Sequence, residues 1–166
     1  GNSNAGTAYA RGWEISYLQQ FRFLPGLLKT LRLNGNLTQL WAHGDYGVAG
    51  AYFKNKDVNG FIPRTVNLGL NWDYKKFGAS FTYNFTSESV RGANSNLTAL
   101  SRNRYMRSRD LFNMNLRYQF YRNMTLNFGV QNIFNEPQRY YRGIPDQMET
   151  FLMQGTTITA GIEGRF

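Results

Sequence analysis

The side chains of this sequence that could take part in chemistry are mostly arginine and tyrosine. Cysteine is absent and His43 is the only histidine. These facts exclude a disulfide framework, a thiolate metal site and a cysteine nucleophile. A zinc site or a Ser-His-Asp relay would depend on His43 alone, beside Asp45 in a predicted loop, where a lone imidazole is usually a surface residue. We therefore expect no catalytic residues, no metal site, no cofactor and no enzymatic activity.

A short basic segment is the strongest candidate for binding an anion. It contains Tyr105 and four arginines, namely Arg102, Arg104, Arg107 and Arg109. The net charge of +9 brings nucleic acid into consideration, because basic patches with aromatic side chains bind phosphate backbones. The spacing matches no nucleic-acid motif, so we predict no nucleic-acid partner. Two hypotheses stay open: bidentate contacts with phosphates or with an anionic ligand, and a solvated loop with scattered charge.

A second aromatic and basic cluster follows later in the chain, at Tyr140, Tyr141 and Arg142. Such side chains stack on the ring of a sugar or a siderophore. They also anchor a protein at the level of lipid headgroups, and this interpretation is favoured here.

An alternation with a period of two residues dominates the segments that must position these side chains. Charged residues make up 17% of the chain, against roughly 25% in an average soluble domain, and 18 Asn and 17 Gly are present. We find no convincing helical periodicity. Apolar side chains recur at every second position in seven segments, at about 13–23, 33–41, 66–72, 79–85, 112–120, 124–130 and 158–166. The sequence predicts an all-β fold of antiparallel strands.

The connections between these segments alternate in length. Short turns are predicted at 25–26, 75–78 and 121–123, whereas the links at about 43–60, 92–108 and 135–154 are long and polar. No run approaches 18 apolar residues, which excludes a transmembrane helix by length. Strands of about ten residues with tight turns on one side and long loops on the other are typical of a transmembrane β-barrel.

The polar positions of the strands distinguish this barrel from a soluble β-sandwich, such as a carbohydrate-binding module. A sandwich usually has a charged surface, but here Asn, Thr, Ser, Gln and Gly predominate, as suits a hydrated lumen. We expect six isolated charges on this face, namely Glu14, Arg32, Asp73, Arg117, Glu163 and Arg165, and among them Glu14, Arg117, Glu163 and Arg165 are the principal lumen-facing candidates. An ion-pair ladder that involves Glu14, Glu163 and Arg165 is one hypothesis for them.

Seven strands do not close a barrel, since the smallest single-chain bacterial barrels have eight and the number is even. An open sheet would leave unpaired backbone edges in lipid. Either an eighth strand lies near 46–53 or 147–153, which gives a self-contained outer-membrane protein with a structural or adhesive role, or the strands belong to a larger barrel.

The C-terminal segment carries a resemblance to a known family. Residues 123–166, with MTLNFGVQNIFNEP, RYYRG and GTTITAGIEGRF, resemble the last two strands of a TonB-dependent outer-membrane receptor. The most specific element is NIFNEP at 132–137. Three earlier elements agree in order: Gly12-Trp13-Glu14, Leu24-Pro25-Gly26, and Ile62-Pro63 ahead of Asn67-Leu68-Gly69-Leu70. The resemblance covers nearly the whole chain, as the final third or less of such a receptor.

This resemblance implies that residues 1–166 are the C-terminal portion of a 22-stranded barrel, without the plug and the earlier strands. It implies import of a scarce nutrient, such as an iron-siderophore complex, cobalamin or an oligosaccharide, across the bacterial outer membrane. TonB would be engaged through the absent N-terminal part, and lumen charges would hold the wall to the plug. Other implied partners are outer-membrane lipid, lipopolysaccharide at the loop arginines, and the barrel-assembly machinery. The sequence does not identify the transported substrate.

The last strand also resembles the assembly signal of outer-membrane proteins, with Thr159, Gly161 and Phe166 at the matching positions. Gly164 departs from that pattern, because a larger apolar residue is usual there. The alternative is that Phe166 belongs only to the lower aromatic girdle.

Overall fold

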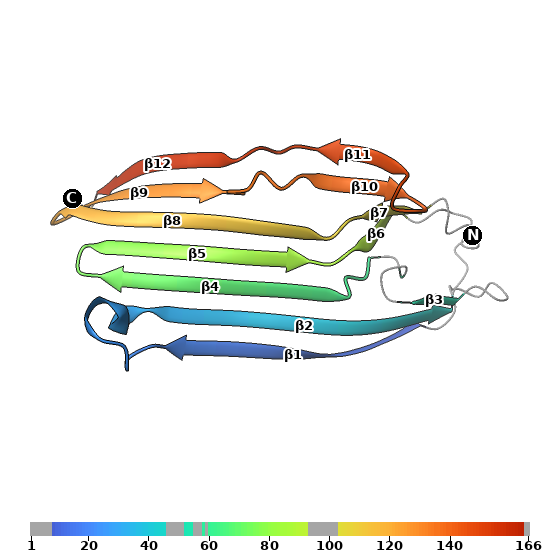
Figure 1. The fold of residues 1–166 in the computed structure, drawn as a ribbon, viewed down its shortest axis with the longest axis horizontal. Helices are drawn as coiled ribbons and strands as arrows, with labels where there is room; N and C mark the ends of the chain where they lie inside the picture. The colour runs from blue at the N-terminus through green and yellow to red at the C-terminus, as the bar shows by residue number, and fades with distance from the viewer. Residues whose placement is uncertain (1–7, 46–51, 55–57, 59, 93–102, 165–166) are drawn as a thin grey trace.

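A computed structural model of the chain describes residues 8–45, 52–54, 58, 60–92 and 103–164. Most of these residues form a long, single-layered antiparallel sheet (Figure 1). Seven strands follow one another in it, in the order β1 (Ala8–Gln20), β2 (Arg32–Asp45), β4 (Arg64–Tyr74), β5 (Phe77–Thr86), β8 (Arg109–Tyr121), β9 (Met124–Gln131) and β12 (Thr157–Gly164). The short β3 (Tyr52–Lys54) pairs with the end of β2. The predicted all-β fold and its seven antiparallel strands are confirmed.

Tight connections lie at one end of this sheet. Residues 75–76 join β4 to β5, where Lys75 has a φ of 52°, and residues 122–123 join β8 to β9. The connection from β1 to β2 is longer than the predicted turn at 25–26, because it holds a 3-10 helix, η1 (Gly26–Thr30). Since β1 ends at Gln20, Phe21 and Phe23 lie in this connection, where their rings contact each other edge to face at 5.8 Å.

A second, smaller sheet lies at the opposite end, where long polar loops were predicted. It contains β6 (Ser89–Gly92), β7 (Arg104–Met106), β10 (Gln138–Arg142) and β11 (Met148–Leu152), in the spatial order β11-β10-β7-β6. We call it the loop sheet. The segment near 147–153 is therefore a strand, but it pairs with β10 and does not extend the main sheet. Of the segment 46–53, only residues 52–53 lie within the described part, and they belong to β3.

The register of the main sheet places mostly apolar side chains on one face and mostly polar side chains on the other. Residues paired across an antiparallel ladder lie on the same face, so each row of partners can be followed from strand to strand. One row runs Leu33, Leu70, Phe81, Met114, Val130, Ile158, and the next runs Gly35, Leu68, Tyr83, Phe112. On the other face one row runs Asn36, Asn67, Asn84 and another runs Asn71, Ser80, Asn115, Gly129, Thr159. The apolar and polar faces deduced from the alternation are confirmed.

Neither face of the main sheet is covered by another layer in the described part of the chain. Ile15, Leu68 and Ile162 on the apolar face are 56%, 42% and 64% exposed. A soluble sandwich buries one face of each sheet against the other. The sandwich hypothesis is therefore wrong for the described strands. Within the described part of the chain, no helix is long and apolar enough to cross a membrane.

Candidate functional site on the polar face and the loop sheet

The polar face of the main sheet is a hydrogen-bonded network of amide and hydroxyl side chains. Asn71 donates to Asn34 across β4 and β2 at 2.9 Å, and Asn84 donates to Asn67 across β5 and β4 at 2.7 Å. Thr82 accepts a hydrogen bond from Asn113 at 3.3 Å. Because these groups are neutral and have several donors and acceptors each, the surface is hydrated without strong attraction for ions of either sign.

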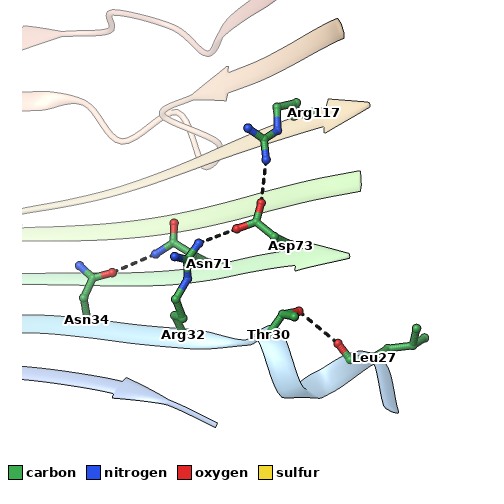
Figure 2. Close-up of polar contacts among 7 residues, drawn as sticks. All are labelled: Leu27, Thr30, Arg32, Asn34, Asn71, Asp73 and Arg117. Carbon is green, nitrogen blue, oxygen red and sulfur yellow. Dashed lines mark hydrogen bonds and ion pairs between the residues drawn. The ribbon is translucent and has the colours of Figure 1, made fainter. Parts of the chain in front are cut away.

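Near the tight-turn end, the network includes one charged cluster, which we call the Asp73 cluster (Figure 2). Asp73 on β4 receives a hydrogen bond from Arg117 on β8, with Arg117 Nη2 at 2.9 Å from Asp73 Oδ1. Its second oxygen, Oδ2, accepts from Arg32 on β2. All three side chains are between 43% and 60% exposed. With two guanidinium groups for one carboxylate, the cluster carries an excess positive charge toward the polar side.

Gly78 explains how Asp73 and Arg117 reach each other. Asp73 pairs with Gly78 on β5, which in turn pairs with Arg117 on β8, so the glycine lies between the two charged residues in one row. A Cβ atom at Gly78 would lie 2.9 Å from Asp73 Oδ1 and 3.1 Å from Arg117 Nε. The cluster therefore uses the space that a side chain on β5 would occupy. The sequence predicts Arg32, Asp73 and Arg117 on this face as isolated charges, but it does not predict that they contact one another, since their proximity depends on strand register.

The other charges expected on the polar face lie apart from this cluster. Glu14 is on β1 and accepts a hydrogen bond from Asn36 Nδ2 on β2. Glu163 is on β12, where it pairs with Thr125. Since β1 and β12 are the two edge strands of the sheet, the structure does not bring Glu14 and Glu163 together. Arg165 lies outside the described residues.

The described arginines of the basic segment lie at the end of the main sheet next to the loop sheet: Arg104 is in β7, Arg107 follows β7, and Arg109 begins β8. Each has a partner in or beside the loop sheet. Arg104 on β7 forms an ion pair with Glu149 on β11, with Nε and Oε2 3.1 Å apart. Arg107 donates to the Pro145 carbonyl at 3.2 Å, and Arg109 donates to Gln154 Oε1 at 2.7 Å. These side chains therefore join separate external segments to one another. Arg102 lies outside the described residues.

The aromatic cluster divides between the interior and the surface of the loop sheet. The rings of Tyr105 and Tyr141 stack at a centroid distance of 5.0 Å and are buried with Val90, the two tyrosines being 3% and 1% exposed. The ring of Tyr141 thus packs inside the loop sheet. The guanidinium of Arg104 lies over the ring of Tyr140, with its central carbon 4.1 Å from the ring centroid. Arg142 forms an ion pair with Glu149.

Glu149 is the acidic centre of the loop sheet, because it contacts both Arg104 and Arg142. The hydrogen bond from Arg142 is the main cause that lowers the pKa of the Glu149 carboxyl below its usual value, and the positive charges of Arg142 and Arg104 act in the same direction. The carboxylate therefore stays ionised at neutral pH and holds β10, β7 and β11 together.

Asn132, the first residue of the NIFNEP segment, connects the loop sheet to the main sheet. Its φ is 53°, a region that asparagine tolerates better than most residues, and Asn135 has a φ of 52°. Its side-chain amide donates to the carbonyls of Glu136 and Gly155 at 3.2 and 3.1 Å, and its side-chain oxygen accepts from the Glu136 N–H at 2.8 Å. The side chain thereby fixes the chain where β9 ends and where β12 is about to begin.

The expected assembly-signal positions lie on β12, the edge strand. The Thr159 hydroxyl donates to the Gly129 carbonyl at 3.5 Å. Gly161 pairs with Asn127, and a Cβ there would meet no described atom within 4 Å, so packing within the described chain does not require glycine at this position. Phe166 lies outside the described residues.

The described residues contain no group of three or more His, Cys, Asp and Glu side chains able to hold a metal ion. The ring of His43 lies 5.9 Å from that of Tyr9 in a tilted arrangement at the external end of β1 and β2.

A comparison with protein families gives one match. A family model described as "TonB dependent receptor-like, beta-barrel" matches residues 1–133. The matched range includes six of the seven main strands in full, namely β1, β2, β4, β5, β8 and β9, and it ends two residues into the NIFNEP segment. Among curated proteins and solved structures, none matches the chain significantly.

Proposed function

The chain belongs to the TonB-dependent receptor β-barrel family of the outer membrane, and on this premise we propose that it forms part of the barrel wall of a receptor that imports a scarce nutrient. The observation that carries this proposal is the separation of the two faces. An apolar face that no described layer covers suits contact with lipid, whereas the opposite face of Asn, Thr and Gly suits a hydrated interior.

Closure by additional strands is the second part of the proposal. The described sheet has β1 and β12 at its two edges, and in a bilayer every backbone N–H and C=O of these edges needs a partner. We propose that residues 1–166 are the C-terminal portion of a larger barrel, with further strands and a plug supplied by the rest of the receptor. TonB would then act through a segment outside these residues.

The polar face would line the passage and contact what fills it. Neutral amides exchange hydrogen bonds with water and with a passing polar solute at little cost in free energy. The Asp73 cluster, with its excess positive charge near the periplasmic rim, is the position on this face best suited to an acidic group of the plug or of the ligand.

The loop sheet would form part of the external entrance. Arg104 contacts both Tyr140 and Glu149 there, which gives a preorganised surface with aromatic and charged groups. We propose that this surface contacts ligand or lipopolysaccharide on the cell exterior, and that Thr159, Gly161 and Phe166 are read by the barrel-assembly machinery.

Growth under nutrient limitation tests the transport function. The gene that encodes this chain would be deleted, and uptake of an iron-siderophore complex, cobalamin and labelled oligosaccharides would be compared with the parent strain. The proposal expects the loss of uptake for one nutrient class, and the same loss when TonB is removed. Unchanged uptake of every class in both strains would contradict it. Uptake in a strain complemented with the Asp73→Asn variant tests separately whether the Asp73 cluster contributes to transport.

A further inference from the structure

We propose that the external end of the apolar face binds a phosphate group of an outer-leaflet lipid, through Arg64 and Arg11. Only the outer-membrane location of the family is needed for this inference, not the proposed transport function. The site lies on β1, β2 and β4 and is separate from the arginines of the loop sheet.

Strand register places both arginines on the face that is otherwise apolar. Arg64 pairs with Gln39, which pairs with Trp13, and the next row outward pairs Trp41 with Arg11. On β4, Arg64 is followed on the same face by Val66, Leu68, Leu70 and Trp72. The two arginines thus stand where the apolar face ends, at the end of the sheet that carries the long connections. In an outer-membrane barrel this is the level of the outer headgroups.

The side chain of Arg64 is oriented by Gln39. The Gln39 amide nitrogen donates to the carbonyls of Leu40 and Pro63, both at 3.3 Å, which turns its side-chain oxygen toward β4. This oxygen accepts a hydrogen bond from Arg64 Nε at 2.6 Å. Arg64 forms no ion pair with a carboxylate among the described residues, so the charge of its guanidinium is not neutralised within them. With Nε held by Gln39, the two terminal amino groups of this guanidinium can both donate to one phosphate.

The surroundings of the two arginines match a lipid headgroup better than a free anion. Trp13 and Trp41 are 43% and 42% exposed beside them, and such rings are enriched at the membrane interface. By strand spacing, the Cα atoms of Arg11 and Arg64 are about 12 Å apart, a separation at which two arginine side chains can both reach one phosphate group between them.

An apolar hollow lies on the same face, nearer the middle of the sheet. It is lined by Leu33, Leu68, Leu70, Phe81, Tyr83 and Phe112. Leu68 follows Arg64 by four residues on the same face, about 13 Å along the strand. An acyl chain attached to a phosphate held at Arg64 would therefore reach the hollow. Asp110 on β8 lies at the edge of the hollow and accepts a hydrogen bond from the Tyr83 hydroxyl at 2.7 Å. Its negative charge repels a phosphate, which favours a position of the phosphate on the opposite side, over β1, β2 and β4.

Lipid binding to the full-length receptor tests this site. The protein that carries this chain would be purified in detergent, freed of lipid, and titrated with lipid A by native mass spectrometry. Arg64→Gln and Arg11→Gln are the test variants. Arg122→Gln, in the tight turn at the opposite end of the sheet, is the matched control, and heat-modifiable gel mobility confirms folding of each variant.

We expect Arg64→Gln to weaken lipid A binding about tenfold, since a hydrogen bond to a charged group is lost, and Arg122→Gln to leave it unchanged. Arg64→Lys should fall between wild type and Arg64→Gln, because it keeps the charge but not the planar fork. Lipid A without its phosphates should bind weakly and equally to wild type and Arg64→Gln.

Three results would overturn the proposal. The first is equal binding of lipid A to wild type, Arg64→Gln and Arg11→Gln. The second is equally tight binding of the dephosphorylated lipid to wild type. The third is displacement of lipid A by inorganic phosphate at matching concentration, which would identify a free-anion site. If Arg64→Gln does not fold, Arg11→Gln and Arg64→Lys decide the question. Nutrient uptake is measured separately, so failure of the lipid site leaves the transport proposal intact.

Discussion

Asp73 and Arg117 form an ion pair across an intervening strand, with 2.9 Å between Asp73 Oδ1 and Arg117 Nη2 and with Gly78 between them in the row. Side chains directly opposite on adjacent strands normally interact first. Here the strand between contributes no side chain, so a contact forms between β4 and β8. The same carboxylate also holds Arg32 on β2, and one residue therefore links three strands of the main sheet.

A Gly78→Ala variant should break this link. The added Cβ would lie 2.9 Å from Asp73 Oδ1, so the carboxylate and the guanidinium must move apart. Because the pair is half exposed, we expect a loss of only about 0.5–1 kcal/mol in the free energy of unfolding, decreasing at high salt. Denaturant titration in lipid vesicles at two salt concentrations measures it, with Ser80→Ala on the same strand as the control. An equal change in both variants would contradict the role of Gly78.

Arginine substitutions on the two faces should have opposite consequences. Leu68→Arg, Leu116→Arg or Phe128→Arg should each cost roughly 2–4 kcal/mol near the bilayer midplane, because the charge enters lipid. Arginine at the neighbouring polar positions should cost little, since these side chains face water: Asn67, Asn115 and Asn127. Folding titrations in lipid vesicles compare the two series. Equal damage in both would show that the apolar face is not the lipid face.

Replacement of Asn132 should destabilise the junction of the two sheets. In Asn132→Ala, the side-chain hydrogen bonds to Glu136 and Gly155 are lost and a φ of 53° becomes unfavourable. We expect a cost of about 1–3 kcal/mol in the free energy of unfolding. Asn135→Gly is the control, because glycine accepts the φ of 52° and the Asn135 side-chain oxygen has no hydrogen-bond donor among the described residues. A control as damaging as Asn132→Ala would refute this explanation.

Acidification should loosen the loop sheet before the main sheet. The pKa of Glu149 is lowered in the folded protein, chiefly by the Arg142 hydrogen bond. A lowered folded pKa stabilises the fold above the ordinary value of 4.5, and this contribution disappears as the pH falls through the lowered value. Hydrogen exchange of the β10 and β11 amides should therefore accelerate below about pH 4.5, relative to β4 and β5, after correction for intrinsic rates. Glu149→Gln should show fast exchange at every pH. If wild type and Glu149→Gln have the same pH profile, Glu149 does not stabilise the loop sheet.

Deletion of Phe166 should reduce insertion more than ligand binding. By resemblance this aromatic residue is read during assembly. The amount of inserted, heat-modifiable receptor would be compared for the deletion, for Arg165→Ala and for wild type. Gly164→Leu should hold or raise insertion if the signal is read at that position. Equal insertion of all variants would leave Phe166 as an ordinary girdle residue.

The main sheet could be predicted from the sequence because the alternation of apolar and polar residues is visible within each single strand. Alternation along a single strand determines which face meets lipid, as Leu68 and Asn67 illustrate, and strands long enough to cross a bilayer repeat the pattern many times. The ends of the strands were less certain: Phe21 and Phe23 continue the aromatic pattern of β1 but lie beyond it.

The loop sheet could not be predicted in this way, because its strands are too short to show a period. β7 and β6 have three and four residues, and their stability comes from pairing across distant segments, with Val90, Tyr105 and Tyr141 in one small core. The contacts within the Asp73 cluster could not be predicted for a related reason, although its three residues were expected on the polar face. Arg32, Asp73 and Arg117 are far apart in sequence, and only the register of four strands brings them together.

The uncovered apolar face means that this wall has no interior of its own to collapse around. Hydrophobic free energy is gained only when apolar area leaves water, and here the acyl chains of the bilayer receive that area. Insertion and acquisition of the native structure are then one thermodynamic event. The free energy of unfolding becomes a joint property of the polypeptide and the lipid, so bilayer thickness acts on this protein as an experimental variable in the way that temperature acts on a water-soluble one.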